Sequence, residues 1–296
     1  MRKLTIALAI LPLLAFAIYL GAGWMMQNQA EKAVASFNQT YPALAKVEYD
    51  SLDASPFSRS VTLHGVDLKI PGNAMRTTAF VETAVITLSP PDRIAVDCTG
   101  VRPNMPAWME HRFRQMEYDP AFIRMQLNLE AAYDPEEGRL DLDAARLEAP
   151  GMGLLELGAK LRELPAGGLQ GGQLAAQAAF TQIAQAEIAY TDHGLTQKRL
   201  ALAAKENNLD PAVYTDRLAD IASQSLLEMA QSQQGRQIAQ ATGEALSAFL
   251  RDPGTLRLGL DPDQPTPLME LALFPPAQIA RHLNLSLHVN QKRYLP

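Results

Sequence analysis

Cysteine is almost absent from this 296-residue chain, which contains only Cys98. A single cysteine cannot form a disulfide within the chain. Its position also excludes a lipoprotein, because lipid attachment needs a cysteine near the N-terminus. Cys98 lies in the apolar run from Ile94 to Val101. This setting predicts a buried small side chain rather than a reactive thiol.

Histidine is scarce as well, and no histidine has a His or Cys neighbour at the spacing of a metal site. The sequence has no H-E-x-x-H motif either. We therefore predict no metal and no other cofactor. His64 falls on the polar side of a predicted strand, and His193 falls in an Asp-His-Gly turn. Both positions predict a solvent-exposed side chain without a functional role. The five histidines are His64, His111, His193, His282 and His288.

Recognised catalytic motifs are missing too. No G-x-S-x-G elbow occurs. The glycine pairs 167–168 and 171–172 lack the Lys and Ser/Thr of a phosphate-binding loop, so they are typical of a linker. We expect a protein that is not an enzyme. The sequence indicates no catalytic, cofactor-binding or metal-binding residues, and leaves the ligand-binding residues undefined.

Two groups of carboxylates are close enough in the sequence to form catalytic pairs. Asp134, Glu136 and Glu137 cluster at a predicted hairpin tip, where water would solvate each of them. Asp141 and Asp143 share one face of a predicted strand, an arrangement that suits a solvated surface equally well. Neither group predicts a site.

The chain has no long basic patch, and His111 to Arg114 is the nearest approach to one. The formal net charge is −6. Removal of residues 1–26, with Arg2 and Lys3, leaves 24 basic and 32 acidic residues, or −8. Since nucleic acid binding requires clustered Lys and Arg, nucleic acid is not expected as a partner.

One long apolar run begins the chain, from Leu4 to Met26, and Arg2 and Lys3 precede it. About 20 apolar residues are needed to span a bilayer as a helix. Cations on the N-terminal side predict that this end is cytoplasmic. We expect a single-pass anchor (1–26) in a bacterial inner membrane, with the bulk of the chain in the periplasm.

A cleaved signal peptide is the alternative for the same segment. Leu4 to Leu14 would be its apolar core, and Ala15-Phe16-Ala17 fits the small-x-small cleavage pattern. The run stays apolar from Ile18 to Met26, which favours the uncleaved anchor. Both interpretations export the remainder.

The exported part divides by its periodicity. Residues 27–44 predict a helical stalk, with Ala30, Ala33, Val34 and Phe37 at helical spacing. Residues 45–163 alternate apolar and polar side chains and predict an antiparallel β domain. Residues 164–172 (LPAGGLQGG) predict a linker. Residues 173–296 predict an α+β region.

The clearest strands lie between residues 125 and 162. They predict a three-stranded meander with one wet face and one apolar face. We expect the apolar face to be buried, with these residues on it: Leu127, Leu129, Leu140, Leu142, Leu155 and Leu157. Upstream strands are expected at 47–53, 61–70, 80–88 and 94–101. Gly65 marks a bulge or bend where the alternation of 61–70 slips.

Helices are expected at about 195–205, 211–231 and 234–251. Asp210 and Pro211 are a favourable start for the second of these. Its buried face is expected to hold Tyr214, Leu218, Ile221, Ser225 and Met229. One face of the third helix, at 234–251, is expected to hold Ile238, Thr242, Ala245 and Phe249. Strands at 183–191, 255–260 and 285–289 and a short helix at 276–283 complete an α+β fold.

A resemblance to AsmA-like and YdgA-like envelope proteins rests on the N-terminal pattern. One anchor is followed by VEYDSLDASPFSRSVTLHGVDLKIPG (Val47 to Gly72), a V-x-Y-x-x-L … L-x-G-V-x-L arrangement. The hairpin at 133–140 and the stretch from Ala189 to Leu195 resemble such proteins too. The resemblance implies an exported, β-rich and curved sheet that shields lipid, with a role in envelope maintenance. The chain is far shorter than AsmA proteins, and no site residue carries over.

Two functions therefore remain. The first is a membrane-tethered protein that binds lipid or another apolar ligand on the apolar sheet face, beneath the helices from Pro211 to Leu250. The small side chains of these helices predict weak docking on the sheet, or, as the alternative, close packing of the two helices on each other as a rigid hairpin. The second is a scaffold or interaction module of the envelope, without a ligand. An enclosed apolar cavity would favour the first. A filled core with an exposed apolar patch would favour the second.

Overall fold

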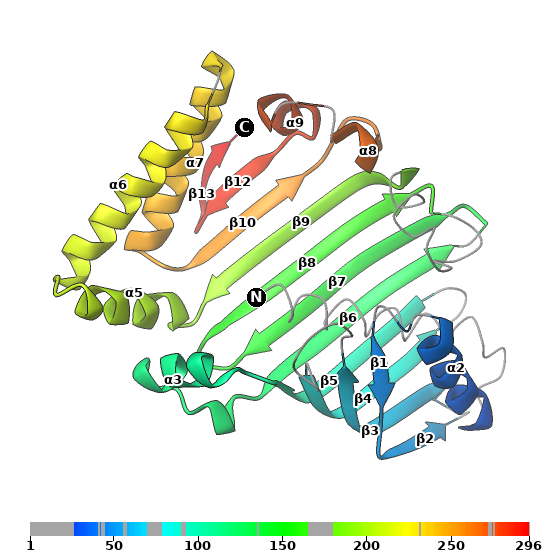
Figure 1. Cartoon of the computed structure of the whole chain (residues 1–296). Helices are drawn as coiled ribbons and strands as arrows, with labels where there is room; N and C mark the ends of the chain where they lie inside the picture. Colours follow the sequence, from blue (N-terminus) through cyan, green and yellow to red (C-terminus); the bar gives the residue numbers. More distant parts are fainter. Residues whose placement is uncertain are drawn as a thin grey trace.

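The computed structural model describes residues 27–40, 42, 45–55, 58–69, 79–89, 93–134, 136–164, 180–230, 232–271, 274 and 276–295. Within these ranges 13 strands form one antiparallel sheet, in which β2 and β11 pair with β3 and β9 outside the main strand order. Figure 1 shows this long sheet with helices near its two ends. The strands lie almost in chain order, β1-β3-β4-β5-β6-β7-β8-β9-β10-β12-β13. The predicted α+β class is confirmed.

The first part of the sheet follows a helix and is interrupted by another. Its elements are α2 (Gln27–Thr40), β1 (Lys46–Glu48), β2 (Ser51–Ser55), β3 (Ser60–Lys69), β4 (Ala79–Ser89), β5 (Arg93–Pro103), α3 (Ala107–Gln115), the 3-10 turn η1 (Pro120–Phe122), β6 (Met125–Asp134), β7 (Arg139–Ala149) and β8 (Gly153–Arg162).

The rest of the chain extends the same sheet and adds a helical layer. Its elements are β9 (Gln182–Asp192), α5 (Leu195–Glu206), α6 (Pro211–Met229), α7 (Gln233–Arg251), β10 (Thr255–Leu260), β11 (Thr266–Pro267), α8 (Leu268–Leu271), α9 (Pro276–His282), β12 (Ser286–Val289) and β13 (Lys292–Leu295). Strand β9 pairs with β8 along most of its length, so the sheet is continuous across the two regions. Apart from Leu164, the expected linker lies outside the described residues.

Apolar side chains form continuous rows across the sheet, because directly opposed residues of antiparallel strands share a face. One row runs from β3 to β13 through Val61, Ile86, Val96, Leu129, Ala145, Leu157, Ile188, Leu258, Leu287 and Leu295. The predicted meander therefore belongs to an apolar face that continues far beyond three strands.

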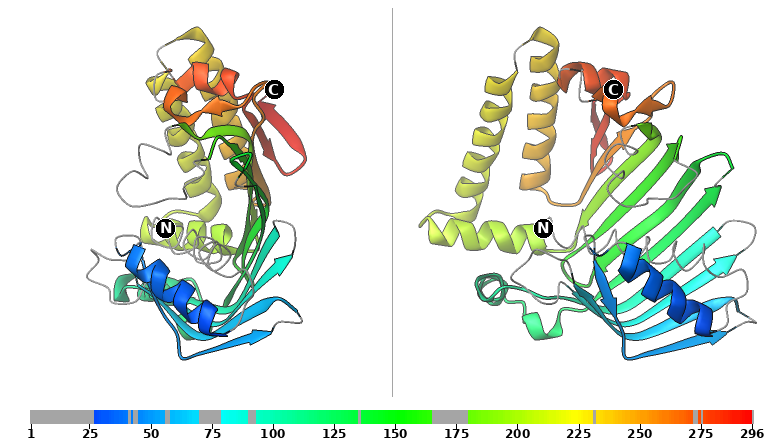
Figure 2. Two further views of the ribbon diagram at one scale, coloured as in Figure 1. Left: turned by 90° about the vertical axis from the view of Figure 1, so that its right-hand side faces the viewer. Right: turned by 45° about the vertical axis from the view of Figure 1, so that its right-hand side comes forward.

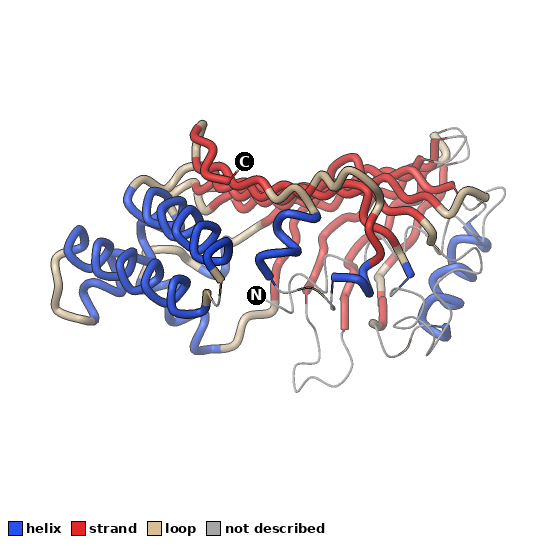
Figure 3. Tube along the Cα trace, turned by 90° about the horizontal axis from the view of Figure 1, so that it is seen from above, coloured by secondary structure: helices blue, strands red, loops and turns tan. Residues whose placement is uncertain are grey.

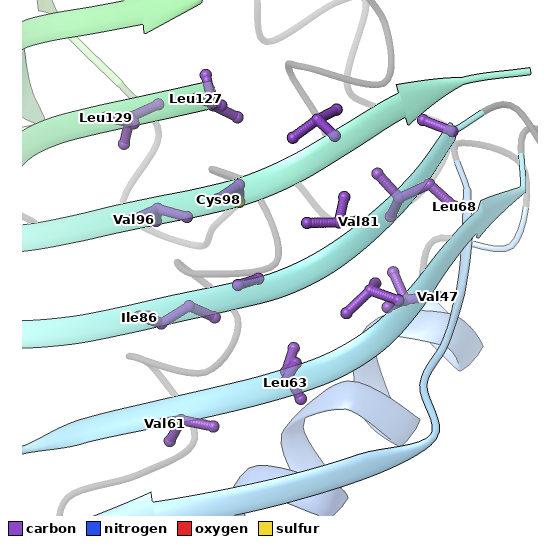
Figure 4. Close-up of a cluster of buried hydrophobic side chains, with 14 of the residues drawn as sticks. Val47, Val61, Leu63, Leu68, Val81, Ile86, Val96, Cys98, Leu127 and Leu129 are labelled. Atoms are coloured by element: carbon purple, nitrogen blue, oxygen red, sulfur yellow. The ribbon is translucent and has the colours of Figure 1, made fainter. Parts of the chain in front are cut away.

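The larger core covers this face over β1 to β6. Helix α2 packs here with the four residues that the sequence predicted, Ala30, Ala33, Val34 and Phe37, each at most 5% exposed. The segment expected as a stalk thus contributes to the core. Figure 4 shows the strands that supply the rest, including Leu63 and Cys98.

A crease crosses β3, β4 and β5 where the alternation slips. Buried residues lie three apart instead of two, as in Leu63 and Val66, and Cys98 and Val101. Two glycines with positive φ, Gly65 at 61° and Gly100 at 65°, lie inside the slip. Positive φ is readily adopted only by glycine, so these residues let both halves of each strand face one core. The bend predicted at Gly65 is confirmed.

A smaller core covers the far end of the same face. Helix α7 places Ala245 and Phe249 against Leu287, Val289 and Leu295. Figure 3 shows α2, α6 and α7 on one side of the sheet.

Helix α6 contacts α7 and α5, and it does not lie over the apolar face. Tight packing explains the pair, since a Cβ on Gly243 would lie 2.8 Å from Ser223 Oγ. The two helices pack closely on each other, as the hairpin alternative expects, and α7 rather than α6 packs on the strands β12 and β13. The predicted inner face of α6 is partly wrong, because Ile221 is 53% exposed while Ala219 is buried.

One predicted strand is divided in the structure, and some elements have no counterpart in the prediction. The strand expected at 47–53 is divided into β1 and β2, which both pair with β3. Helix α3 was not predicted, and neither was the closing strand β13. The anchor expected at 1–26 lies outside the described residues. No helix within the described ranges is long and apolar enough to cross a membrane.

Candidate functional site: an apolar strip on β8 and β9

Within the described part of the chain, neither core covers the apolar face over two neighbouring strands in the middle of the sheet. Their apolar side chains belong to neither core. We call them the central strip, which consists of Leu155, Leu157, Ala159 and Leu161 from β8 and Ile183, Ala186 and Ile188 from β9. The strip therefore separates the two cores without being filled by either.

Exposure is greatest in the middle of the strip. Leu157 and Ile188 pair across the two strands, and each is 40% exposed. Leu127 and Leu129, on the same face of β6, are 1% and 4% exposed. The predicted face of the meander is right, but of the six leucines expected to be buried only Leu127 and Leu129 are. Leu140, Leu142 and Leu155 are half-buried, and Leu157 is exposed. Alternation reveals which side chains share a face and gives no information on what covers them.

The opposite face of these strands is polar and carries ion pairs. Arg146 lies 2.7 Å from Glu156, Arg162 lies 2.7 Å from Asp141, and Arg257 lies 3.4 Å from Glu187. None of the strip residues carries an ionisable group. The two faces of β8 and β9 thus present opposite chemistry to their surroundings.

One end of the strip meets a polar cluster at the start of α5. The Tyr190 hydroxyl donates to Asp192 Oδ1 at 2.8 Å, and its ring packs edge-to-face on Phe249. Asp192 also accepts from the backbone N–H groups of Gly194 and Thr196. These bonds anchor α5 to the end of β9.

The acidities of this cluster follow from its contacts. Burial, together with the hydrogen bond to Asp192, raises the pKa of Tyr190 to about 12. Burial alone would raise the pKa of Asp192, but the hydrogen bonds from Thr196, Tyr190 and Gly194 together lower it. Both groups are already satisfied by the protein, so we assign them a structural role.

Two hollows lie near the strip without being lined by it. One of about 260 Å³ lies between η1 and the β7–β8 turn and is lined in part by Phe122, Ile123 and Met152. The other, of about 450 Å³, lies between the end of α7 and the β12–β13 hairpin.

The residues singled out from the sequence do not come together. Cys98 is buried as expected, and burial raises the pKa of its thiol to about 12. His64 faces the polar side of β3, 3.5 Å from Asp53. His193 is exposed in its turn.

The carboxylates form ordinary surface contacts. Asp134 accepts hydrogen bonds from the backbone N–H groups of Glu136 and Glu137 at the hairpin tip. Asp141 pairs with Arg162, and Asp143 lies 3.7 Å from Arg93. Across the described ranges, no group of three or more His, Cys, Asp or Glu could hold a metal ion.

Comparison with known proteins gives one family match. A family described as "Uncharacterized protein" matches residues 146–290, which is just under half of the chain. This range includes both strands of the central strip and the helices from α5 to α7. A search of curated proteins finds no match.

Proposed function

We propose that this chain is a membrane-tethered periplasmic envelope protein that holds lipid or another apolar ligand on the central strip. The observation that carries the proposal is the 40% exposure of Leu157 and Ile188 in the middle of an otherwise covered apolar face. Such exposure of paired large side chains costs solvation free energy unless something covers them.

The dimensions of the strip suit a slender occupant. Two strands are about 10 Å wide, and the distance from Leu155 to Leu161 is about 20 Å. This is the shape of an extended acyl chain. Helices lie on the same side of the sheet over both ends of the strand order, α2 at one end and α7 at the other (Figure 3). A flat protein surface would meet these helices before it reached the strip.

The ligand would lie on an open surface rather than in an enclosed cavity. An enclosed cavity was the feature expected to favour ligand binding, and neither of the two hollows described is lined by the strip. The proposal therefore rests on the recessed position of the strip and on its lack of charge.

The proposed location rests on residues 1–26, which lie outside the described residues. Their cations and apolar run support a single-pass inner-membrane anchor with a cytoplasmic N-terminus. The resemblance to AsmA-like and YdgA-like proteins supports the same compartment.

The test compares a charge on the strip with the same charge on the wet face. Leu157→Glu places a carboxylate in the middle of the strip, and Gln185→Glu places one on the exposed opposite face of β9. We expect the full-length wild type and Gln185→Glu to keep lipid after mild detergent extraction, as measured by native mass spectrometry. Leu157→Glu should lose that lipid while remaining folded by circular dichroism.

An interaction module without a ligand is the second candidate, because the open strip could also bind a protein segment. A wild-type protein that retains no lipid in this experiment would favour it. Equal lipid retention by Leu157→Glu and Gln185→Glu would place the ligand elsewhere.

A further inference from the structure

Two large aromatic side chains project into solvent from the segment that connects β5 to β6. Trp108 in α3 is 66% exposed, and Phe122 in η1 is 79% exposed. Helix α3 has no buried residue of its own. The third strongly exposed ring, Phe180, lies just before β9, at the opposite end of that strand from its junction with α5.

The segment that carries these rings is firmly held. The Phe113 and Tyr118 rings pack edge-to-face, and the Tyr118 hydroxyl donates to Gly151 O at 2.8 Å. Lys198 of α5 lies over the Tyr118 ring, and Arg112 Nη1 donates to both carboxylate oxygens of Glu206. Trp108 and Phe122 are thus presented outward on a fixed base.

A hollow and an apolar row lead from Phe122 to the central strip. Phe122 lines the 260 Å³ hollow together with Ala149 and Met152. Ala149 lies two residues beyond Leu147, on the same face of β7. Leu147 pairs directly with Leu155, the first residue of the strip. The hollow is also lined by Glu117, Asp119 and Arg124. The exposed ring therefore lies across this hollow from a half-buried apolar row of β7 that continues into the proposed ligand surface.

The segment has no net charge to attract an ionic partner. Residues 105–124 contain three acidic and three basic residues. The basic ones are paired, Arg112 with Glu206, Arg114 with Glu110 and Arg124 with Glu82. A neutral surface with a protruding Trp and Phe complements the headgroup region of a zwitterionic bilayer, where such rings are enriched.

We propose that the α3–η1 segment docks on the bilayer surface and forms the entrance through which an acyl chain reaches the central strip. The proposal rests on the proposed function. In Figures 1 and 2, α2 and α3 lie at the same end of the molecule. The apolar run of residues 1–26 directly precedes α2, so a bilayer that holds this run can also contact α3.

The two tryptophans of the chain make a direct test possible. They are Trp24, in the apolar run, and Trp108, so Trp24→Phe leaves Trp108 alone. The full-length variant is reconstituted into phosphatidylcholine vesicles, and flotation confirms its association with them. We expect Trp108 emission to fall roughly twofold or more when brominated lipids replace unlabelled ones, because a docked ring lies near the bromine atoms. High salt should not reverse this, since the segment is neutral.

A matched control moves the single tryptophan from α3 to position 180, which lies just before β9 and far along that strand from α5. The control is one triple variant that combines Trp24→Phe, Trp108→Phe and Phe180→Trp. The emission of its single tryptophan should be insensitive to brominated lipids and sensitive to aqueous acrylamide. The proposal is overturned if Trp108 behaves in this way, or if the tryptophan at position 180 is the one that brominated lipids quench.

Lipid retained on the strip is measured in the same samples by mass spectrometry. Retained lipid with an unquenched Trp108 would refute the entrance alone. A quenched Trp108 without retained lipid would refute the proposed function and leave the docking in place.

Discussion

Leu129 and Leu157 occupy the same apolar row of the sheet, yet Leu129 is 4% exposed and Leu157 is 40% exposed. Their surroundings account for the difference. Leu129 faces the larger core, whereas Leu157 lies on the central strip, between the two cores. Both leucines lie in a sequence that alternates apolar and polar residues. The sequence pattern therefore does not distinguish a side chain that contacts a ligand from one that packs in a core.

The two leucines should therefore differ in their contribution to stability. Leu129→Ala should lower the free energy of unfolding by about 2–5 kcal/mol, as expected for a buried leucine. Leu157→Ala should lower it by only about 1 kcal/mol, because much of its surface is already exposed. Chemical denaturation of the full-length variants measures both. Equal losses would mean that the strip is packed in solution.

The Asp192 cluster gives stability a dependence on pH. Its carboxylate is hydrogen-bonded in the folded chain, which lowers its pKa below the ordinary 3.8. The resulting stabilisation is complete above pH 3.8 and is lost as the pH falls through the lowered folded value. The gap in unfolding free energy between wild type and Asp192→Asn should therefore narrow below pH 3.8. A gap of constant size down to strongly acidic pH would contradict this role.

At the scale of elements, the crease across β3 to β5 depends on glycine. Gly100 has φ of 65°, and a Cβ there would meet the Glu82 side chain. Gly158 in β8 is a matched control, because a Cβ there would have 3.7 Å to its nearest neighbour and its φ is not positive.

Alanine at these two positions should affect the free energy of unfolding differently. Gly100→Ala should cost about 1–2 kcal/mol, since left-handed backbone is strained for an L-residue. Gly158→Ala should be neutral or stabilise by a few tenths of a kcal/mol, through a less flexible unfolded chain. Melting temperatures of the two variants are compared. If they were equal, the positive φ of Gly100 would not be required for the crease.

Most elements could be predicted from periodicity, and those that were missed share a physical reason. Strands β6 and β8 alternate cleanly, whereas β7 slips between Leu142 and Ala145. Helix α2 carries four apolar residues at helical spacing. Helix α3 buries no residue, so it has no apolar stripe to reveal it. Strand β13 has only four residues. Short or unpacked elements depend on tertiary contacts that the local sequence does not encode.

The candidate site was only half predictable. The alternation of Leu155 to Leu161 gave its chemistry and the face on which it lies. Its exposure depends on where α6 and α7 pack. Helix α6 packs on α7 through a close approach between Gly243 and Ser223. The small residues of both helices allow such a pair, but they do not show which of the two helices lies on the sheet. The uncovered strip is thus a property of the assembled fold.

At the scale of the whole molecule, the proposed topology predicts the fate of both ends. A reporter that is active only in the periplasm, fused after Pro296, should be active. The mature protein should sediment with membranes and retain residues 1–26, because the apolar run extends beyond the candidate cleavage site. N-terminal sequencing checks this. A soluble mature protein that begins at Ile18 would refute the anchor while leaving export intact.

Ligand contact on the central strip is the central claim, and photocrosslinking tests it most directly. Full-length protein is reconstituted with phospholipid that carries a photoactivatable group on its acyl chain, irradiated, and mapped by peptide mass spectrometry. We expect adducts on peptides of β8 and β9 that contain Leu157 and Ile188, and their loss in Leu157→Glu but not in Gln185→Glu. Adducts confined to residues 1–26, with none on the strip, would contradict the account.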